Sequence, residues 1–341
     1  MNSQPEELDR LSARFRKFAD SEARDSSPLY ASLAARVAED PDLLNIAALV
    51  PEGQPVANLL FGAVQYLLRP TGEQISSEFT EEQAFRIFRM TAVGRLPKIE
   101  LILSNRFVQT NEVRRSIYLL PAFIRICQFF PGREFALVEL GTSAGLNLLF
   151  DEYRFQFRRR PPFWESGFER RSPGYPTRPP QTAHDNDARQ SYCFPDWNRL
   201  KPVDIGNEAE VEWLRSLIWP EHRDRAELLE EALAVRRESD VQVHAGDGVA
   251  MLRSIIEPLP VQVVPIVSHT HVANQLRAES RVELLRHIAG FGVTRDFVHL
   301  HNNIEPHLHA TIWSGDARAD LPLALVDGHA RWVEWLDAWH S

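Results

Sequence analysis

An apolar, strand-like segment near the middle of the chain runs directly into a short turn that contains two glycines. Phe135–Leu140 is followed by Gly141-Thr142-Ser143-Ala144-Gly145 and then by a stretch with helical character. Glycine lets a backbone bend and approach a ligand without a Cβ clash. A helix N-terminus behind the turn offers unpaired N–H groups and a positive dipole end. The pattern predicts a site for a polar or anionic cofactor group at the C-terminal edge of a sheet.

The spacing of the small residues narrows the choice of cofactor. A dinucleotide-binding turn would need glycine at positions 141, 143 and 146, and only position 141 meets this. No Gly-Lys-Ser/Thr sequence occurs, which excludes a P-loop. The turn is instead similar to that of class I S-adenosylmethionine-dependent methyltransferases, in which an acidic residue precedes Gly-x-Gly-x-Gly. An ordinary strand–helix turn is the alternative. The resemblance implies that the cofactor S-adenosylmethionine contacts Glu139, Gly141, Thr142, Ser143, Gly145 and Asn147.

Two histidines come directly after another apolar run, Val261–Val267. Residues at the C-terminal end of a central strand face the ligand crevice, and histidine titrates near neutrality. We therefore predict that His269 and His271 are catalytic and lie on the reaction side of the cleft. Hydrogen-bonded structural histidines are the alternative.

A dense polar cluster leads into the last helix before the turn. Helix capping explains part of it but does not require five hydrogen-bonding side chains in a row. We expect a loop that closes over the cofactor and substrate, formed by Arg106, Gln109, Thr110, Asn111 and Glu112.

Three further functions stay open. The pairs His269/His271, His299/His301 and His307/His309, with Glu305 among them, could chelate zinc or iron in a metal-dependent hydrolase or oxygenase. Three pairs exceed the needs of one site, so we predict no metal. Gly141–Gly145 also has the form G-x-S-x-G of an esterase turn centred on Ser143, but residues 1–130 supply helices where a hydrolase needs strands. A non-catalytic cofactor- or nucleotide-binding protein is the third possibility.

The predicted elements that position these residues differ between the two parts of the chain, and the first part is helical. In residues 1–130 apolar side chains such as Leu8, Leu11 and Phe15 recur at helical spacing. Thr80-Glu81-Glu82-Gln83 has the form of a capping box, and a further helix is expected at 112–130. The sequence predicts a helical cap domain over residues 1–132.

From residue 133 onward, strand-like runs alternate with helical stretches. The expected strands are Phe135–Leu140, Val241–His244, Val261–Ser268, Phe297–His301 and Leu323–Val326, although Pro265 weakens the third. The expected helices are Ala144–Asp151, Glu208–Leu217, Glu221–Arg237, Val249–Ile256 and Ser280–Ala289. The alternation predicts an α/β fold in residues 133–341, a Rossmann-like, mainly parallel sheet with helices on both faces.

The composition of the chain argues against some classes of binding partner. The net charge of −9 argues against a general nucleic-acid or membrane-surface binder, because both need a cationic face. The stretch 154–198 is an Arg/Pro-rich insertion, with seven arginines against two glutamates between Arg154 and Arg178. Only two cysteines occur, and neither a secretory leader nor a membrane-spanning run is evident. We expect a cytoplasmic protein with a small-molecule substrate, whose oligomeric state the sequence does not reveal.

Beyond the turn, the chain resembles a bacterial family catalogued as domain of unknown function 2332. The resemblance rests on Arg106–Val113, Glu139–Asn147, Pro202–Asp204, Trp213-Leu214, Ile218–Pro220 and Gly246-Asp247. It implies a class I methyltransferase-like fold and cofactor, with Asp247 contacting the adenine. The family usually has an aspartate for the ribose hydroxyls where this chain has Arg199, which cannot accept a hydrogen bond. Asp204 or Asp196 is a candidate substitute. The alternatives are a low cofactor affinity, or a ligand whose phosphate pairs with Arg199.

Overall fold

The computed structural model describes residues 5–109, 111–153, 155–160, 163–168, 189–192, 202–273 and 276–336, with the backbone alone between 155 and 192. The chain forms two compact units, one made of Met1–Thr110 and Asp204–Leu229, the other of Asn111–Val203 and Glu230–Ser341. Among the described residues, none of the helices is both long and apolar enough to cross a membrane.

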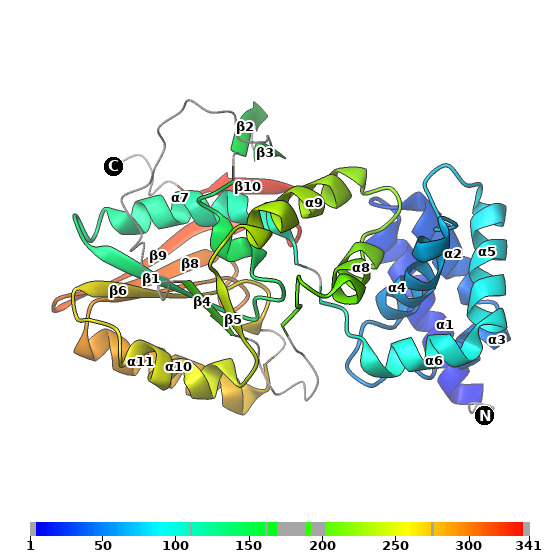
Figure 1. The fold of residues 1–341 in the computed structure, drawn as a ribbon, viewed down its shortest axis with the longest axis horizontal. Helices are drawn as coiled ribbons and strands as arrows, with labels where there is room; N and C mark the ends of the chain where they lie inside the picture. Colours follow the sequence, from blue (N-terminus) through cyan, green and yellow to red (C-terminus); the bar gives the residue numbers. More distant parts are fainter. Residues whose placement is uncertain are drawn as a thin grey trace. The chain divides into compact units, whose positions relative to one another are not determined.

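The first unit, which we call the helical unit, contains no strand among its described residues (Figure 1). Its core is aromatic, with Phe61 contacting Tyr30 and Phe88 through edge-on ring pairs. The predicted capping box is confirmed at Thr80 and Gln83. Its elements are α1 (Pro5–Phe18), η1 (Ala19–Ala23), α2 (Pro28–Val37), α3 (Pro41–Ala47), α4 (Val56–Leu68), η2 (Arg69–Thr71), α5 (Glu81–Gly94), α6 (Leu96–Asn105), α8 (Glu208–Ser216) and the first half of α9 (Arg223–Arg237).

The second unit, the sheet unit, is built on one sheet with the strand order β2-β3-β10-β9-β8-β7-β6-β1-β4-β5. The strands are β1 (Glu134–Leu140), β2 (Phe155–Arg160), β3 (Phe163–Phe168), β4 (Arg189–Tyr192), β5 (Gln242–His244), β6 (Val263–His269), β7 (Phe297–His301), β8 (Leu308–Ser314), β9 (Ala317–Val326) and β10 (Trp332–Trp335). The predicted α/β class is confirmed, and the predicted strand Phe297–His301 is found with the same bounds.

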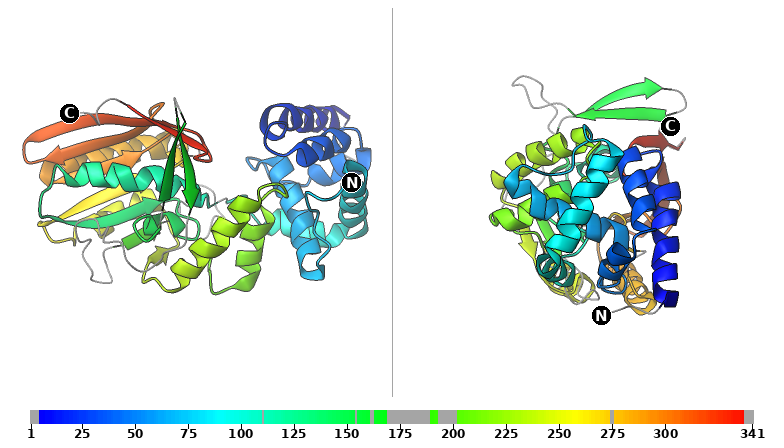
Figure 2. Two further views of the ribbon diagram at one scale, coloured as in Figure 1. Left: turned by 90° about the horizontal axis from the view of Figure 1, so that it is seen from above. Right: turned by 90° about the vertical axis from the view of Figure 1, so that its right-hand side faces the viewer.

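The prediction of a mainly parallel sheet is wrong, because the sheet is mixed. Strands β5, β4, β1, β6 and β7 are parallel, whereas every pairing from β7 through β8, β9, β10 and β3 to β2 is antiparallel. The reason is the length of the connections. The links between β7 and β8, β8 and β9, and β9 and β10 are too short for the crossover helix that a parallel pair needs. Figure 2 shows these orange and red C-terminal strands continuing the sheet.

Helices cover both faces of the sheet (Figure 1). On one face, Val138 and Val267 belong to a core shared with α10 (Gly248–Ile256) and α11 (Ala278–Thr294). On the other face lies α7 (Ser116–Cys127), whose Phe123 contacts Phe135 of β1 at a ring-centroid distance of 5.3 Å. Since α7 shares its core with the sheet, it belongs to the sheet unit rather than to the predicted cap of residues 1–132.

Two local expectations need correction. The predicted α-helix Ala144–Asp151 is absent, and only the short 3-10 helix η4 (Leu146–Leu149) follows the turn after β1. The expected long helix over 112–130 is shorter and is preceded by the 3-10 helix η3 (Val113–Arg115). By contrast, Pro265 does lie in the central strand β6. Because β6 pairs with β7 only from Ile266 onward, this proline takes part in the β1 ladder alone.

Candidate functional site

The turn after β1, Gly141–Gly145, which we call the β1 turn, has an unusual backbone. Gly141, Ser143 and Gly145 all adopt the left-handed conformation, with φ values of 76°, 56° and 78°. A Cβ atom on Gly141 would lie 2.5 Å from Cγ2 of Val272, so the loop after β6 packs directly against the turn. Glycine is therefore required at position 141 by both the backbone and the packing.

The polar backbone groups of the β1 turn are largely satisfied from within the protein. The side-chain oxygen of Asn111 accepts hydrogen bonds from the N–H groups of Ala144 at 3.0 Å and Leu146 at 3.5 Å. The carbonyl of Ala144 accepts from Nε of Arg236 at 3.1 Å. The carbonyl of Ser143 accepts from the N–H of Val203 at 3.1 Å. Two N–H groups that the sequence suggested for a ligand are thus already held by Asn111.

A buried carboxyl group lies beside the turn. Glu139, 4% exposed at the end of β1, accepts a hydrogen bond from the hydroxyl of Thr142 at 2.6 Å. Burial raises the pKa of Glu139 to about 7, although hydrogen bonds from Thr142 and Asn147 and the charge of Arg115 act in the other direction. Asn147 in turn accepts from the hydroxyl of Ser116 at the start of α7. The structure therefore brings Glu139, Thr142 and Asn147 together beside the turn.

His271 lies in the loop after β6, next to the residue that packs on Gly141. Its backbone N–H donates to Asn302 at 2.7 Å, and its Nδ1 lies 2.9 Å from Nδ2 of Asn303. Because that amide nitrogen can only donate, Nδ1 accepts and Nε2 carries the proton of the neutral ring. Burial, together with the charges of Arg115 and His329 nearby, lowers the pKa of His271 to about 3. The imidazole is neutral at physiological pH.

Backbone strain is concentrated at the same edge of the sheet. Among the described residues, those other than glycine with left-handed φ are Ser143, His271, Asn303 and Ala330, and they follow β1, β6, β7 and β9 respectively. These four strands run in the same direction, since β9 is antiparallel to β8 as β7 is. Asparagine adopts this conformation readily, but the other three do so at a cost of about 1–3 kcal/mol each. Strained residues of this kind gather at active sites and ligand clamps.

Charged groups from two further segments reach this edge. Arg115 donates from Nε and Nη2 to the carbonyl of Gly328, at 3.3 and 3.2 Å. Glu112 is 2% exposed, and one of its carboxylate oxygens lies 3.2 Å from Nδ1 of His329. Glu112, predicted as part of a lid, is thus held against the β9–β10 turn.

His269 does not share the site with His271. It is fully buried on β6, on the face of the sheet that α10 and α11 cover, and its Nε2 lies 2.9 Å from Nε2 of His299. His301 and His309 continue the group across β7 and β8, with ring centroids 5.6 Å from His269 to His301 and 5.4 Å from His301 to His309. We call His269, His299, His301 and His309 the histidine cluster.

The two residues of a His-x-His pair lie together in one case and apart in another. His299 and His301 do share one face of β7, with ring centroids 4.2 Å apart, but His269 and His271 diverge because the strand ends between them. Burial lowers the pKa of His269 to about 4 and that of His301 to about 3. Within the part of the chain that the structure describes, no three or more His, Cys, Asp or Glu side chains are arranged to hold a metal ion.

The remaining predicted residues lie elsewhere. Arg106 belongs to the helical unit, where its guanidinium lies over the rings of Tyr66 and Trp213. Asp204 is an exposed residue of the same unit and accepts a hydrogen bond from the N–H of Gly206. Asp247 caps α10 by accepting from Val249 and Ala250, a use that the sequence did not suggest. Gln109 is half-buried in the helical unit, whereas Thr110, Asp196 and Arg199 lie outside the described residues.

Sequence reasoning missed several residues of the site. Asn302 and Asn303 follow β7 directly, so their place at a strand end was a usable signal. Nothing in the local sequence pointed to Arg115, His329 or Arg236, because each reaches the site only through the packing of a distant segment.

Comparison with known proteins identifies a family for this chain. Neither the curated proteins nor the solved structures contain a match to it. One family model matches residues 12–335, which is nearly the whole chain. The protein therefore belongs to domain of unknown function family 2332, described as uncharacterized proteins conserved in bacteria.

Proposed function

We propose that this protein is an S-adenosylmethionine-dependent methyltransferase that acts on a small-molecule acceptor. The cofactor binds at the β1 turn, and the acceptor binds beside His271 at the carboxyl end of β6. The observation that carries the proposal is the strand order, which reverses at β1, next to a turn with three left-handed residues.

The strand order supports a ligand at this place. In the parallel part, β5-β4-β1-β6-β7, the chain builds outward from β1 in one direction through β4 and β5 and in the other through β6 and β7. Connections therefore diverge between β1 and β6, and ligands of open α/β sheets bind at the carboxyl ends of the strands at such a switch point. The β1 turn lies at the carboxyl end of β1, and the loop after β6 that contains His271, which we call the His271 loop, lies at the carboxyl end of β6.

An unsatisfied hydroxyl supports a ligand at the turn itself. Ser143 is 7% exposed, and its Oγ has no hydrogen-bond partner among the described residues. Buried polar groups without partners are rare, and a bound ligand is one way to satisfy them. Ser143 also replaces the middle glycine of the methyltransferase pattern, where the backbone comes closest to the cofactor.

The side chains of the site have different roles in methyl transfer, some toward the cofactor and one toward the acceptor. Glu139, Thr142 and Asn147 form the cofactor side, where a carboxylate suits the cationic groups of S-adenosylmethionine. A histidine with a pKa near 3 removes protons poorly at neutral pH. We therefore assign His271 to orienting the acceptor through its Nε2–H, since methyl transfer depends chiefly on alignment.

Ligand-dependent stability tests the proposal. S-adenosylmethionine or S-adenosylhomocysteine at roughly 100-fold its Kd should add about 2.7 kcal/mol to the unfolding free energy, which raises the melting temperature. ATP and NAD at the same concentration should have no effect. A shift with ATP or NAD alone would indicate a nucleotide-binding protein instead, and no shift with any of the four would refute the proposal.

Replacing the unsatisfied hydroxyl gives a sharper prediction. Ser143→Ala keeps a side chain at the same backbone angle and removes only Oγ, so the free protein should be as stable as wild type or slightly more stable. Affinity for S-adenosylhomocysteine should fall roughly fivefold to tenfold, the loss of one hydrogen bond. Ser254→Ala, at an exposed serine of α10, is the matched control. Calorimetric affinities that are equal in all three proteins would remove Ser143 from the site.

Cofactor binding should release protons from Glu139. With a pKa of about 7, this carboxyl is about half protonated at neutral pH, and an adjacent cationic ligand favours the carboxylate. Binding of S-adenosylmethionine at about pH 7 should therefore release up to about half a proton. Calorimetry in buffers of different ionisation enthalpy measures this release, and Glu139→Gln should abolish it. Equal proton release by the variant would exclude Glu139 as its source.

A further inference from the structure

Arg115, in the 3-10 helix η3 that precedes α7, is a half-buried cation of the sheet unit. Its Nε and Nη2 both donate to the carbonyl of Gly328, at 3.3 and 3.2 Å. A guanidinium carries five N–H donors in a planar fork, so this contact uses only the edge that Nε and Nη2 form. On the outer edge, one N–H of Nη1 and one N–H of Nη2 point the same way. No described residue accepts a hydrogen bond from that outer edge.

The two carboxylates that adjoin this contact in the sequence have other partners. Glu112, the N-cap of η3, lies 3.2 Å from Nδ1 of His329. Asp327 forms an ion pair with Arg331 at 2.9 Å. Within the described part of the chain, no carboxylate forms an ion pair with Arg115. Because charged groups that are withdrawn from water are normally paired, this guanidinium is a candidate for binding an anionic ligand.

Arg115 lies close to both parts of the proposed site. Burial raises the pKa of Glu139 and lowers that of His271, and the charge of Arg115 also acts to lower the pKa of each. Since the interaction between charges weakens with distance, both groups lie near the guanidinium. A Cβ atom on Gly328 would lie 3.6 Å from Cε1 of His271, so the residue that holds Arg115 also lies against the imidazole ring.

We propose that the outer edge of Arg115 binds a carboxylate of the methyl acceptor, so that the substrate of this protein is a carboxylic acid. This inference rests on the proposed function for the reaction, but not for the binding of the anion. A carboxylate fits a guanidinium edge through two parallel N–H···O hydrogen bonds, which makes the pair strong and directional. The carboxylate holds the acceptor, and His271 orients the rest of the molecule.

The charges around Arg115 favour a carboxylate over a phosphate. A phosphate monoester offers a similar pair of oxygens but carries close to two negative charges near neutral pH. Glu112 and Asp327 are both acidic, and like charges nearby disfavour the second negative charge of a phosphate. A carboxylate brings only the single charge that Arg115 balances.

Titration of the full-length protein with acetate, in the absence of any cofactor, tests the proposal. Nuclear magnetic resonance of the protein with isotope-labelled histidine follows the ring signals of His271, which are identified by their absence from His271→Gln. The titrations are done at constant ionic strength and at about pH 7.5, where an ordinary histidine is mostly neutral. Acetamide, which has the shape of acetate without its charge, and inorganic phosphate are titrated in parallel.

The expected result separates the charge of Arg115 from its geometry. Acetate should shift the His271 signals to saturation, phosphate should bind more weakly, and acetamide should give no saturable shift. Arg115→Gln should weaken acetate binding roughly tenfold or more, the loss of a charge-assisted pair. Arg115→Lys keeps the charge without the fork, so its affinity should lie between those of wild type and Arg115→Gln.

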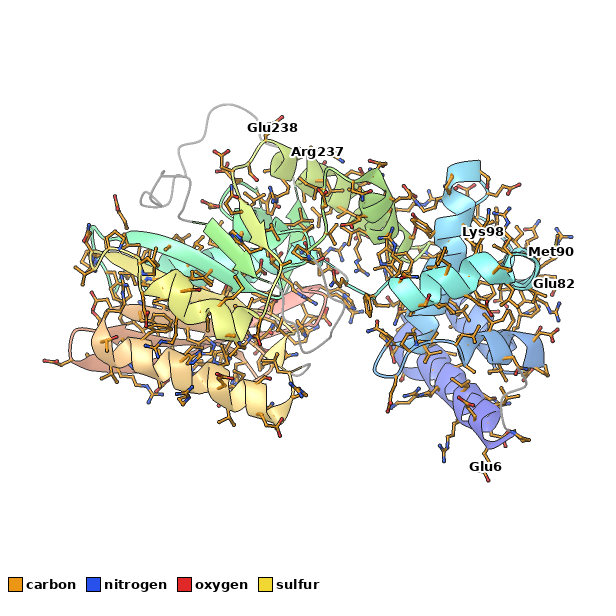
Figure 3. The ribbon with its side chains drawn as sticks, turned by 60° about the horizontal axis from the view of Figure 1, so that its bottom comes forward. Glu6, Glu82, Met90, Lys98, Arg237 and Glu238 are labelled. Atoms are coloured by element: carbon orange, nitrogen blue, oxygen red, sulfur yellow. The ribbon has the colours of Figure 1, made fainter. Side chains whose placement is uncertain are left out.

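An exposed arginine of the same unit provides the matched control. Arg237 is the last residue of α9 (Arg223–Arg237) and is labelled in Figure 3. Arg237→Gln changes the net charge of the chain by the same amount as Arg115→Gln, and it should bind acetate like wild type. If circular dichroism shows that Arg115→Gln does not fold, the comparison of Arg115→Lys with Arg237→Gln decides in its place.

The outcomes separate this proposal from the proposed function. The absence of a saturable shift with acetate, or equal affinities of the Arg115 variant and Arg237→Gln, overturns the assignment of a carboxylic acid. Tighter binding of phosphate than of acetate also overturns it, in favour of a phosphate ester. S-adenosylhomocysteine binding is measured separately by calorimetry. If acetate binds through Arg115 and S-adenosylhomocysteine does not bind, the anion site stands and the methyltransferase assignment fails.

Discussion

Lowering the pH from about 7.5 to about 5 is expected to remove a large part of the stability of the sheet unit. His269, His299 and His301 are buried side by side, and burial is the largest cause that lowers the pKa of each. The unfolded chain binds protons at its histidines below about pH 6.5, whereas the folded state takes them up only at lower pH. Stability is therefore lost as the pH falls below about 6.5, down through the folded-state pKa values of about 4 for His269 and about 3 for His301.

The expected loss of unfolding free energy follows from the difference in proton binding between the folded and the unfolded state. At about pH 5, each histidine that stays neutral in the folded protein costs about 2 kcal/mol, so three cost up to about 6 kcal/mol. Glu139 acts in the opposite sense, because its raised pKa makes the folded state take up a proton as the pH falls through about 7. One carboxyl group offsets part of the loss from three histidines.

Urea unfolding followed by circular dichroism at several pH values measures this effect. His299→Leu removes one titrating ring from the middle of the cluster and should make the pH dependence shallower. His244→Gln removes an exposed histidine at the end of β5 and serves as the control. An unfolding free energy that stays constant between about pH 7.5 and about pH 5 would show that the histidine cluster is not held neutral by the fold.

The second large effect is expected from adding one methyl group to the β1 turn. Gly141→Ala would place a Cβ atom 2.5 Å from Val272, on a backbone with φ 76°. The backbone conformation alone costs about 1 kcal/mol, and the forced movement of a packed side chain costs about 1–3 kcal/mol more. We expect a loss of about 2–4 kcal/mol and a loss of cofactor binding, since the turn and the His271 loop can no longer meet.

The chain offers a closely matched control for this substitution. Gly132 has φ 75°, and a Cβ atom there would meet nothing within 4 Å. Gly132→Ala therefore measures the backbone cost alone, and the difference between the two variants measures the contact with Val272. The double variant Gly141→Ala/Val272→Ala should recover part of the stability. If Gly141→Ala were no more destabilising than Gly132→Ala, the β1 turn and the β6 loop would not be in contact in solution.

Some structural features of this protein can be predicted from short stretches of its sequence. The apolar run of β1, the turn glycines and the capping box at Thr80 could be predicted because each depends on neighbours within a few residues. The same holds for β7, whose five residues were found as expected. Periodicity, chain reversal and capping are local properties, so the order of the residues determines them directly.

The tertiary structure decided what the sequence left open or suggested wrongly. The direction of β8, β9 and β10 depends on pairing between strands, and it turned an expected parallel sheet into a mixed one. The same pairing set His301 opposite both His269 and His309. His271 lies apart from them because β6 ends at His269.

The β1 turn combines a feature that the local sequence predicts with contacts that only the tertiary structure determines. Its glycines are visible in the sequence, yet its N–H groups are held by Asn111, 33 residues earlier, and one of its carbonyls by Arg236, 92 residues later than Ala144. Contacts between such distant residues depend on how whole elements pack, and no local pattern encodes that. The sequence by itself determined where the chain bends, and only the packed fold determined which groups meet at the bend.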